Sequence, residues 1–209
     1  MIIAVDGPTA SGKGTIAKAL AAHFGLPVLD TGLLYRAVGY QTQLDHGDPD
    51  NAADALAACE FPASLLDDPA LRFESTGSLA SRASVHPQVR AALLQRQVDF
   101  ANQPGGAVLD GRDIGTVIAP HADAKLFVTA SPEERARRRH AEMLARGVDV
   151  SFDAVLADVH ARDARDTGRA DAPLLRAADA MLLDNSDMDR DAAIAAAIAF
   201  VEERRKARG

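Results

Sequence analysis

Gly7-Pro8-Thr9-Ala10-Ser11-Gly12-Lys13-Gly14-Thr15 is the stretch of sequence that decides the fold. An apolar run at 2–5 precedes it, and a helical pattern at 13–24 follows it and ends at Gly25. A glycine-rich turn in this context lets backbone N–H groups converge on an anion, and the helix N-terminus adds positive potential. The stretch fits the pattern GxxxxGK, whose lysine reaches the β- and γ-phosphates of a nucleotide. We therefore predict a nucleotide-binding loop, and a chance glycine-rich turn is the alternative.

Apolar runs alternate with helical patterns along the rest of the chain. Further strands are predicted at 27–29, 107–109, 125–129 and 180–183, and a last helix at 189–205. Such alternation implies parallel crossovers, so we expect an α/β fold: a P-loop NTPase-like parallel five-stranded sheet with helices on both faces. Polar motifs follow Val5, Leu29 and Leu109, at the strand ends where ligands of such sheets bind.

Two segments interrupt the alternation. Residues 45–88 show weak helical stretches and no strand pattern, and we expect them to form an inserted acceptor-binding subdomain. Residues 131–170 are strongly helical: a capping box begins one helix at Ser131-Pro132-Glu133-Glu134, and a second helix follows at 152–166. We expect this hairpin to act as a lid. The expected organisation is one domain, 1–209, with a core of about 1–44, 89–130 and 171–209.

Composition excludes several classes of protein. Thirty acidic and 23 basic residues give a net charge of −7, which disfavours binding to nucleic acid or anionic membranes. The single cysteine, Cys59, cannot form an internal disulfide and is expected to be a buried apolar residue. We see no secretory signal and no transmembrane run, and we expect a cytoplasmic monomer. The basic residues are 19 Arg and 4 Lys, an excess that indicates either phosphate recognition or genome bias.

Several arginines and carboxylates stand where phosphate chemistry needs them. Arg36 and Arg112 each follow a strand end and are predicted to clamp an acceptor phosphate, with surface salt bridges as the alternative. Asp110 ends an apolar strand and is predicted to orient Mg²⁺, with a helix cap as the alternative. Arg162, Arg165 and Arg169 share one face if their helix continues that far. Their alternative role is pairing with carboxylates nearby in the sequence, at Asp158, Asp163 and Asp166.

A family resemblance narrows these possibilities. The residues GKGT in place of GK[ST] are similar to nucleoside monophosphate kinases, and Asp30-Thr31-Gly32-Leu33-Leu34-Tyr35-Arg36 resembles a motif of bacterial-type cytidylate kinases. Asp110-Gly111-Arg112-Asp113-Ile114-Gly115-Thr116-Val117 resembles the most specific segment of that family. The likeness covers nearly the whole chain outside roughly 45–78. It implies transfer of the γ-phosphate of ATP to CMP or dCMP, in pyrimidine nucleotide metabolism.

Residue chemistry and the resemblance together give the expected site residues. The expected catalytic residues are Lys13, Arg112, Arg162 and Arg169. The expected ATP-binding residues are Gly7, Pro8, Thr9, Ala10, Ser11, Gly12, Lys13, Gly14, Thr15, Arg135 and Arg139. The expected acceptor-binding residues are Thr31, Arg36, Ser81, Arg90, Arg112, Asp113, Arg162, Asp166 and Arg169, and the expected Mg²⁺ ligands are Thr15 and Asp110. Two other functions stay open: a small P-loop kinase for UMP, AMP or shikimate, and a nucleotide-binding module without transfer activity.

Overall fold

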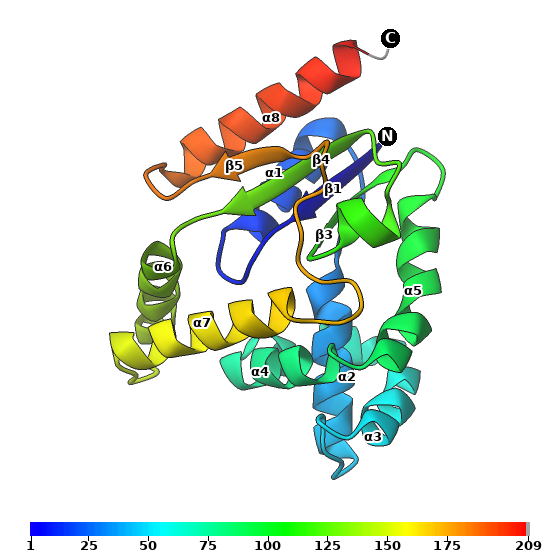
Figure 1. Cartoon of the computed structure of the whole chain (residues 1–209), viewed down its shortest axis with the longest axis vertical. Helices are drawn as coiled ribbons and strands as arrows, with labels where there is room; N and C mark the ends of the chain where they lie inside the picture. The colour runs from blue at the N-terminus through cyan, green and yellow to red at the C-terminus, as the bar shows by residue number, and fades with distance from the viewer. Residues whose placement is uncertain (208–209) are drawn as a thin grey trace. The chain divides into compact units, whose positions relative to one another are not determined.

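A computed structural model describes residues 1–207 of the chain and contains a five-stranded sheet in the order β2-β3-β1-β4-β5 (Figure 1). The strands are β1 (Ile2–Asp6), β2 (Val28–Asp30), β3 (Ala107–Gly111), β4 (Ala124–Thr129) and β5 (Met181–Asp184). β1 pairs in parallel with β3 and β4, and β4 pairs in parallel with β5. The predicted α/β class with a parallel five-stranded sheet is therefore confirmed.

The helices follow the predicted alternation with the strands. They are α1 (Lys13–Phe24), α2 (Thr31–Leu44), α3 (Ala52–Ala57), α4 (Glu74–Ala83), α5 (Pro87–Ala101), α6 (Pro132–Ala145), α7 (Phe152–Thr167) and α8 (Arg190–Lys206). Short helical turns lie at η1 (Ala58–Glu60), η2 (Ala63–Asp67), η3 (Pro69–Arg72) and η4 (Ile114–Ile118). α1 begins and ends at the predicted residues because Gly12 and Gly25 adopt left-handed backbone conformations on either side of it.

The predicted strand ends differ from the structure by one or two residues, and the difference is largest at β3. β3 continues past Leu109 through Gly111, because Asp110 pairs with Val5 and Gly111 with Asp6 in the parallel ladder. The last two residues of this strand, Asp110 and Gly111, are not of the types that usually fill a hydrophobic core, but all five residues of the strand are buried. Asp110 is thus inside the sheet, and the alternative role of a helix cap does not describe it.

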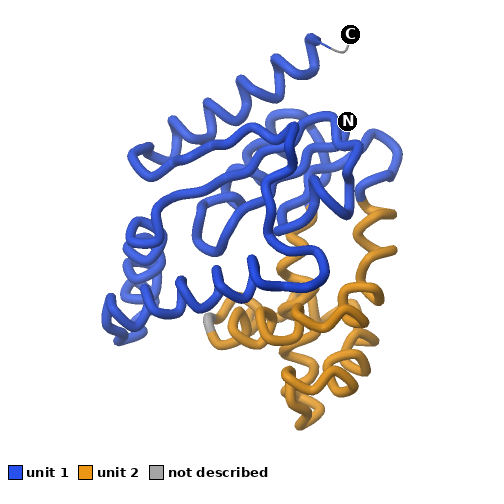
Figure 2. Tube along the Cα trace, viewed as in Figure 1, with its two compact units in different colours: residues 1–28, 101–209 blue, residues 29–100 orange. Residues whose placement is uncertain are grey.

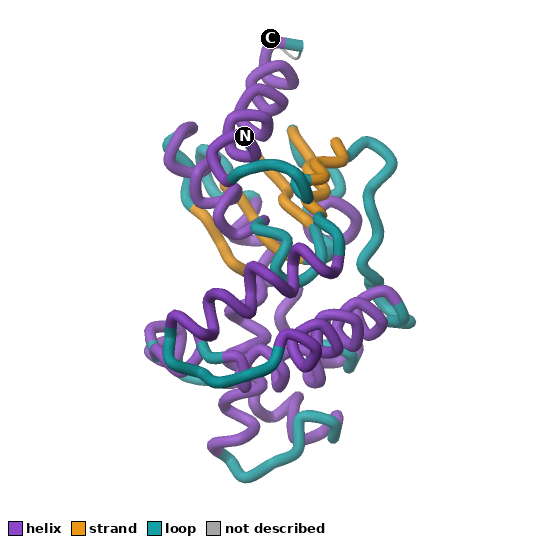
Figure 3. The backbone as a smooth tube through the Cα atoms, turned by 90° about the vertical axis from the view of Figure 1, so that its left-hand side faces the viewer, coloured by secondary structure: helices purple, strands orange, loops and turns teal. Residues whose placement is uncertain are grey.

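The chain divides into two compact units, Met1–Val28 with Ala101–Gly209 (unit 1) and Leu29–Phe100 (unit 2) (Figure 2). In unit 1, the strands form one layer (Figure 3). Apolar residues of α1 and α8 share a buried cluster with Ile3, Val5 and Leu126. Side chains alternate across a strand, so Ala4 and Asp6 of β1 face the other way, toward η4. This arrangement holds the end of β1 between a helical layer and the η4 turn.

The hairpin of α6 and α7 also lies in unit 1. The Ser131 side chain accepts a hydrogen bond from the Glu134 N–H at 3.2 Å, which confirms the N-cap half of the predicted capping box. The other half is wrong, because the Ser131 N–H donates to Ser186 Oγ at 2.9 Å and the Glu134 carboxylate accepts from Arg138. α6 ends at Ala145, and Gly147 follows with a φ of 77°. Ala136 of α6 packs against Val155 and Val159 of α7 in a small core of their own. The two helices therefore hold each other, as the hairpin prediction requires.

Unit 2 contains the residues of the expected insert together with α2 and α5. Its core gathers α2, α4, α5 and the short turns around Leu34, Val38 and Leu71. Cys59 is half-buried at the edge of this core, and burial raises the pKa of its thiol to about 11. Such a thiol is unreactive at neutral pH. Among the described residues, no helix is both long and apolar enough to cross a membrane.

Gly39 sets how closely α2 and α4 approach. A Cβ at this position would lie 2.7 Å from the carbonyl carbon of Leu79 and 2.9 Å from the amide nitrogen of Ala80. We predict that Gly39→Ala lowers the free energy of unfolding by about 1–3 kcal/mol, because α4 must move. Urea unfolding measures it, with Gln43→Ala on an exposed position of the same helix as the control. Alanine normally stabilises a helix interior relative to glycine by about 1 kcal/mol, so a stabilised Gly39→Ala protein would contradict this account of the packing.

Candidate active site

The predicted nucleotide-binding loop connects β1 to α1. Gly7 has no room for a side chain, since a Cβ there would lie 2.0 Å from the carbonyl oxygen of Val128 on β4. Ala10 and Gly12 have φ values of 57° and 82°, so the loop curls through left-handed conformations before the helix begins. The Lys13 ammonium donates to the Pro8 carbonyl oxygen at 3.4 Å. The lysine therefore folds back along the loop that it is predicted to serve.

Asp110 explains why the sequence reads GKG where GK[ST] is usual. A Cβ on Gly14 would lie 2.9 Å from Asp110 Oδ2, and Lys13 Nζ lies 3.9 Å from Asp110 Oδ1. Asp110 is 5% exposed, so its carboxylate has little space into which to move. A serine or threonine at position 14 would displace the carboxylate, and the next hydroxyl in the chain is that of Thr15, exposed in the first turn of α1.

The donor groups near the loop suit a magnesium ion bound together with a nucleotide. Mg²⁺ is usually held by one or two protein oxygens, several waters and substrate phosphates. No group of three or more His, Cys, Asp or Glu residues within 1–207 forms a metal cage. A buried carboxylate beside the loop and a hydroxyl in the adjoining helical turn fit a magnesium ion that is held by one or two protein oxygens together with waters and phosphates. Asp110 and Thr15 remain our predicted ligands.

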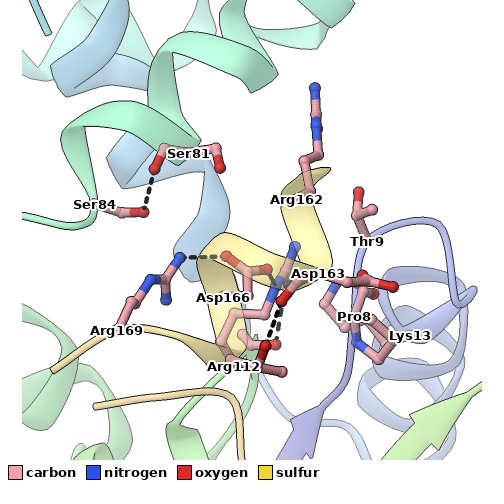
Figure 4. A network of polar contacts seen from close by, with 12 residues as sticks. Pro8, Thr9, Lys13, Ser81, Ser84, Arg112, Arg162, Asp163, Asp166 and Arg169 are labelled. Atoms are coloured by element: carbon pink, nitrogen blue, oxygen red, sulfur yellow. Dashed lines mark hydrogen bonds and ion pairs between the residues drawn. The ribbon is translucent and has the colours of Figure 1, made fainter. Parts of the chain in front are cut away.

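The Asp166 carboxylate holds two of the predicted catalytic arginines (Figure 4). Arg112 Nε donates to Asp166 Oδ2 at 2.7 Å, and an Arg169 terminal nitrogen donates to Asp166 Oδ1 at 2.5 Å. Burial raises the pKa of the Asp166 carboxyl, but Arg112 and Arg169 outweigh it, so the pKa is lowered. Asp166 is therefore ionised at neutral pH and acts as the counterion that gathers both guanidinium groups.

Arg162 lies in α7 one turn before Asp166. Its Nε lies 2.9 Å from Asp158 Oδ2, and Figure 4 shows the side chain extending away from Asp166. Burial lowers the pKa of Arg162, the Asp158 carboxylate opposes this shift, and the nearby Arg112 adds to it. An anion bound near Arg112 and Arg162 would stabilise these two positive charges.

The second helix of the hairpin ends within one residue of its predicted end, so the condition for a face shared by Arg162 and Arg169 is not met. α7 ends at Thr167, so Arg169 lies beyond the helix, where the chain returns to pair with Asp166. Gly168 follows the last turn, and its N–H caps the helix on the Ala164 carbonyl. Pairing with aspartates, the alternative considered for these arginines, describes both Arg162 and Arg169.

Arg135 of α6 is committed to contacts within unit 1. It is 3% exposed and makes two hydrogen bonds to the Asp163 carboxylate, at 3.0 and 2.6 Å. Its remaining donors reach the carbonyl oxygens of Ala130 at 2.9 Å and of Thr9 at 3.2 Å. Arg135 thus touches the phosphate loop through the Thr9 carbonyl. The predicted direct contacts of Arg135 and the half-buried Arg139 with ATP stay predictions.

The predicted acceptor-binding residues are split between the units, four in unit 2 and five in unit 1. Arg36 lies in α2 and donates to the carbonyl oxygens of Leu71 and Phe73, both at 2.9 Å. In the same unit, Thr31 begins α2, Ser81 lies in α4 and Arg90 lies in α5. The Arg90 guanidinium is buried and stands over the ring of Tyr35, 5.5 Å from its centroid. Arg36 and Arg112 belong to different units, so their joint clamp stays a prediction.

Asp6 is an important residue that the sequence analysis missed. Its two carboxylate oxygens accept hydrogen bonds from the N–H groups of Ile114 and Gly115, at 2.8 and 2.7 Å. These bonds hold the η4 turn, which directly follows Arg112 and the buried Asp113. A polar residue that ends an apolar strand was the available signal, and we applied it to Asp110 alone.

Asn185, in the loop between β5 and α8, was also missed. It is 4% exposed, and its side-chain amide donates to the Ser11 carbonyl oxygen of the phosphate loop at 2.9 Å. Its sequence neighbours, Asp184 and Ser186, make it look like an ordinary polar turn. No spacing rule links position 185 to position 11, so only the folded chain reveals this contact.

The family model for cytidylate kinase matches residues 3–203. The chain belongs to the cytidylate kinase family. A protein of Xanthobacter autotrophicus named cytidylate kinase is 58% identical over 208 residues and covers all of both chains. One of Caulobacter vibrioides with the same name is 56% identical, over 98% of this chain and 96% of its own.

A solved structure of an uncharacterized protein from Eubacterium ventriosum resembles this member of the cytidylate kinase family in fold alone. The TM-score is 0.56 at 16% identity, over 97% of this chain and 98% of the other. The family match and the two named relatives together confirm the predicted resemblance across the whole chain.

Asp6 generates a prediction about stability and pH. Burial raises the pKa of its carboxyl to about 7, with Asp113 and Asp110 adding to the shift and the two N–H groups opposing it. The unfolded-state pKa is about 4. The native state therefore binds the additional proton, and the contribution of Asp6 to the free energy of unfolding decreases as the pH rises from about 4 to about 7. Asp6→Asn should remove that slope and cost about 1–3 kcal/mol below pH 4, because an amide cannot accept both N–H bonds.

Urea unfolding of the wild type and the variant across pH 3–8 measures this effect. Asp184→Asn is the matched control, since hydrogen bonds from Ser186 hold the pKa of the Asp184 carboxyl below its usual range. Removing that carboxyl leaves the slope between pH 4 and 7 in place. Parallel wild-type and Asp6→Asn profiles over that window would refute the assignment.

Proposed function

We propose that the chain transfers the γ-phosphate of ATP to CMP or dCMP and releases ADP with CDP or dCDP. The observation that carries the proposal is the phosphate loop with Lys13 in the same unit as the arginine pair that Asp166 gathers. The membership in the cytidylate kinase family supports it independently. This is the ATP-dependent kinase that the sequence analysis predicts.

Phosphoryl transfer requires positioning and neutralisation of charge more than covalent chemistry from the protein. Lys13 is proposed to contact the β- and γ-phosphates, and Arg112, Arg162 and Arg169 are proposed to contact the transferred group and the acceptor phosphate. Asp166 fixes two of these guanidinium groups by hydrogen bonds from within the protein. Less side-chain freedom is therefore lost when the phosphates bind.

The acceptor needs no general base. Its attacking oxygen belongs to a phosphate that is already anionic at neutral pH. We propose that Asp113 accepts from the amino group of cytosine, because an ionised carboxylate only accepts hydrogen bonds. Ser81 and Arg90 are proposed to read the ring carbonyl and nitrogen, while Thr31, Arg36 and Asp166 hold the rest of the nucleotide.

Magnesium is the proposed cofactor, with Asp110 and Thr15 as its protein contacts and the ATP phosphates as its other ligands. When bound, it neutralises charge on the β- and γ-phosphates. Gly7 to Thr15 form the proposed ATP cradle, and Arg135 and Arg139 belong to the hairpin beside it. Residues 131–170 are proposed as the lid that excludes water, and about 45–88 as the acceptor-binding insert. The substrates occur in the cytoplasm, where we propose that the protein acts as a monomer.

A panel of acceptors tests the proposed function. ADP production is measured with CMP, dCMP, UMP, AMP and shikimate, each with and without Mg²⁺. We expect turnover with CMP and dCMP that depends on Mg²⁺, and far less with the others. Turnover with another acceptor but none with CMP or dCMP would refute the proposal. ATP binding without ADP release for any acceptor would favour a regulatory nucleotide-binding module.

Lys13→Ala tests the loop itself. We expect the turnover number with ATP and CMP to fall by roughly 10²–10³-fold, as when one preorganised electrostatic donor is removed. Lys18→Ala is the matched control, because Lys18 is exposed on the same helix. Circular dichroism and thermal unfolding check that both variants fold. Near-normal turnover in folded Lys13→Ala protein would remove the loop lysine from the mechanism.

A further inference from the structure

Carbonyl groups of the phosphate loop are held by side chains outside the loop. The Thr9 carbonyl oxygen accepts a hydrogen bond from Arg135 at 3.2 Å. The Ser11 carbonyl oxygen accepts one from the Asn185 side-chain amide at 2.9 Å. Neither carbonyl oxygen can bind a phosphate itself, since a carbonyl oxygen repels an anion. What they fix is the direction in which each peptide group faces.

That direction decides where the loop can bind an anion. In a planar trans peptide, the C=O and the next residue's N–H point to opposite sides. Holding the Ser11 carbonyl toward Asn185 therefore turns the Gly12 N–H away from Asn185. Holding the Thr9 carbonyl toward Arg135 likewise turns the Ala10 N–H away from Arg135. Converging backbone N–H groups are what a phosphate-binding nest consists of.

The loop needs this support because its backbone is strained. The strain lies at Ala10, whose φ of 57° costs a residue with a Cβ about 1–2 kcal/mol. Conformations of this kind persist only where the surroundings determine them. Arg135 holds the peptide that precedes Ala10, and Asn185 holds the peptide that precedes Gly12.

Asn185 is itself fixed by α6. Arg138 donates to Asn185 Oδ1 at 2.9 Å and to the Asn185 carbonyl oxygen at 2.7 Å. Glu134 accepts from Arg138 Nε at 2.9 Å and holds the guanidinium in place. Because arginine only donates, the amide oxygen must face Arg138 and the amide nitrogen must face Ser11. The side-chain amide of Asn185 therefore has one allowed orientation.

We propose that Asn185 is a positioning residue for nucleotide binding, which transmits the placement of α6 through Arg138 to the Ser11–Gly12 peptide. This inference rests on the proposed function only in that the loop binds ATP. It assigns a role in ATP affinity to Arg138, an α6 residue whose guanidinium donates to Asn185 and lies beside Gly12. It also makes the affinity of the loop depend on the hairpin to which α6 belongs.

Asn185→Asp separates the two halves of the contact. The aspartate still accepts from Arg138, but it cannot donate to the Ser11 carbonyl and places a negative charge against it. We expect the Kd for ATP, measured by isothermal titration calorimetry, to rise about 10- to 100-fold, as for one unsatisfied buried polar group. The KM for CMP should change by less than about threefold. Loss of both affinities to the same extent would indicate a merely structural role and overturn the proposal.

Arg138→Ala provides the second variant, and Arg137→Ala its matched control. Both arginines lie on α6 and pair with Glu134, but Arg137 is exposed and Arg138 reaches Asn185. Arg138→Ala should weaken ATP binding and Arg137→Ala should not. In the double variant Arg138→Ala/Asn185→Asp, the two effects should combine to less than their product, because both act through one peptide.

The outcome is separable from that of the acceptor panel. Wild-type ATP affinity in folded Asn185→Asp and Arg138→Ala proteins, or independent effects in the double variant, would overturn the positioning role. If Asn185→Asp does not fold, the split between ATP and CMP in Arg138→Ala decides alone. A wild type that binds ATP and phosphorylates neither CMP nor dCMP would refute the proposed function and leave these binding comparisons valid.

Discussion

The peptide groups of the loop between β1 and α1 are the constraint on which the rest of the structure depends. To collect N–H groups around a phosphate, the loop must pass through left-handed conformations at Ala10 and Gly12 and place carbonyls on its outer side. Those carbonyls need donors, and the fold supplies them from Lys13, Arg135 and Asn185. The parallel sheet makes this possible, because the carboxyl ends of β1, β4 and β5 lie along one edge. The loop is therefore a product of its neighbours as much as of its own glycines.

Charge in unit 1 is arranged around the same edge. Arginines brought together without a ligand repel one another, and the structure offsets this with carboxylates: Asp166 between Arg112 and Arg169, and Asp158 beside Arg162. These pairs fix the guanidinium groups, with Arg162 buried and Arg112 and Arg169 half-buried. The excess of arginine over lysine fits this use, because the planar fork bonds a carboxylate and a phosphate with the same geometry. Genome bias is not needed to account for arginines at these positions.

The sequence predicted the parts of the fold that follow from local pattern. The α1 helix, the start of α6 at the N-cap Ser131 and the strands of the sheet came from apolar periodicity and from glycine and proline positions. The end of β3 was misjudged because its last residues are polar yet lie inside the ladder. The end of α7 was predicted to within one residue, but the pairing of Arg169 with Asp166 beyond that end follows from the path of the returning chain, which no helical spacing describes. Asn185 escaped notice because its partner lies more than one hundred residues away in the chain. Asp6 carried the same local signal as Asp110, a polar residue at the end of an apolar strand, but its partners in η4 are equally distant in the chain.

The central claim is that this edge of the sheet passes a phosphoryl group from one nucleotide to another and keeps water out of the reaction. The fate of the γ-phosphate tests it most directly. ATP labelled with ³²P in the γ-position is incubated with CMP and Mg²⁺, and the products are separated by chromatography. The account predicts that the label appears in the β-phosphate of CDP. Label released as inorganic phosphate, with CMP left unlabelled, would contradict it.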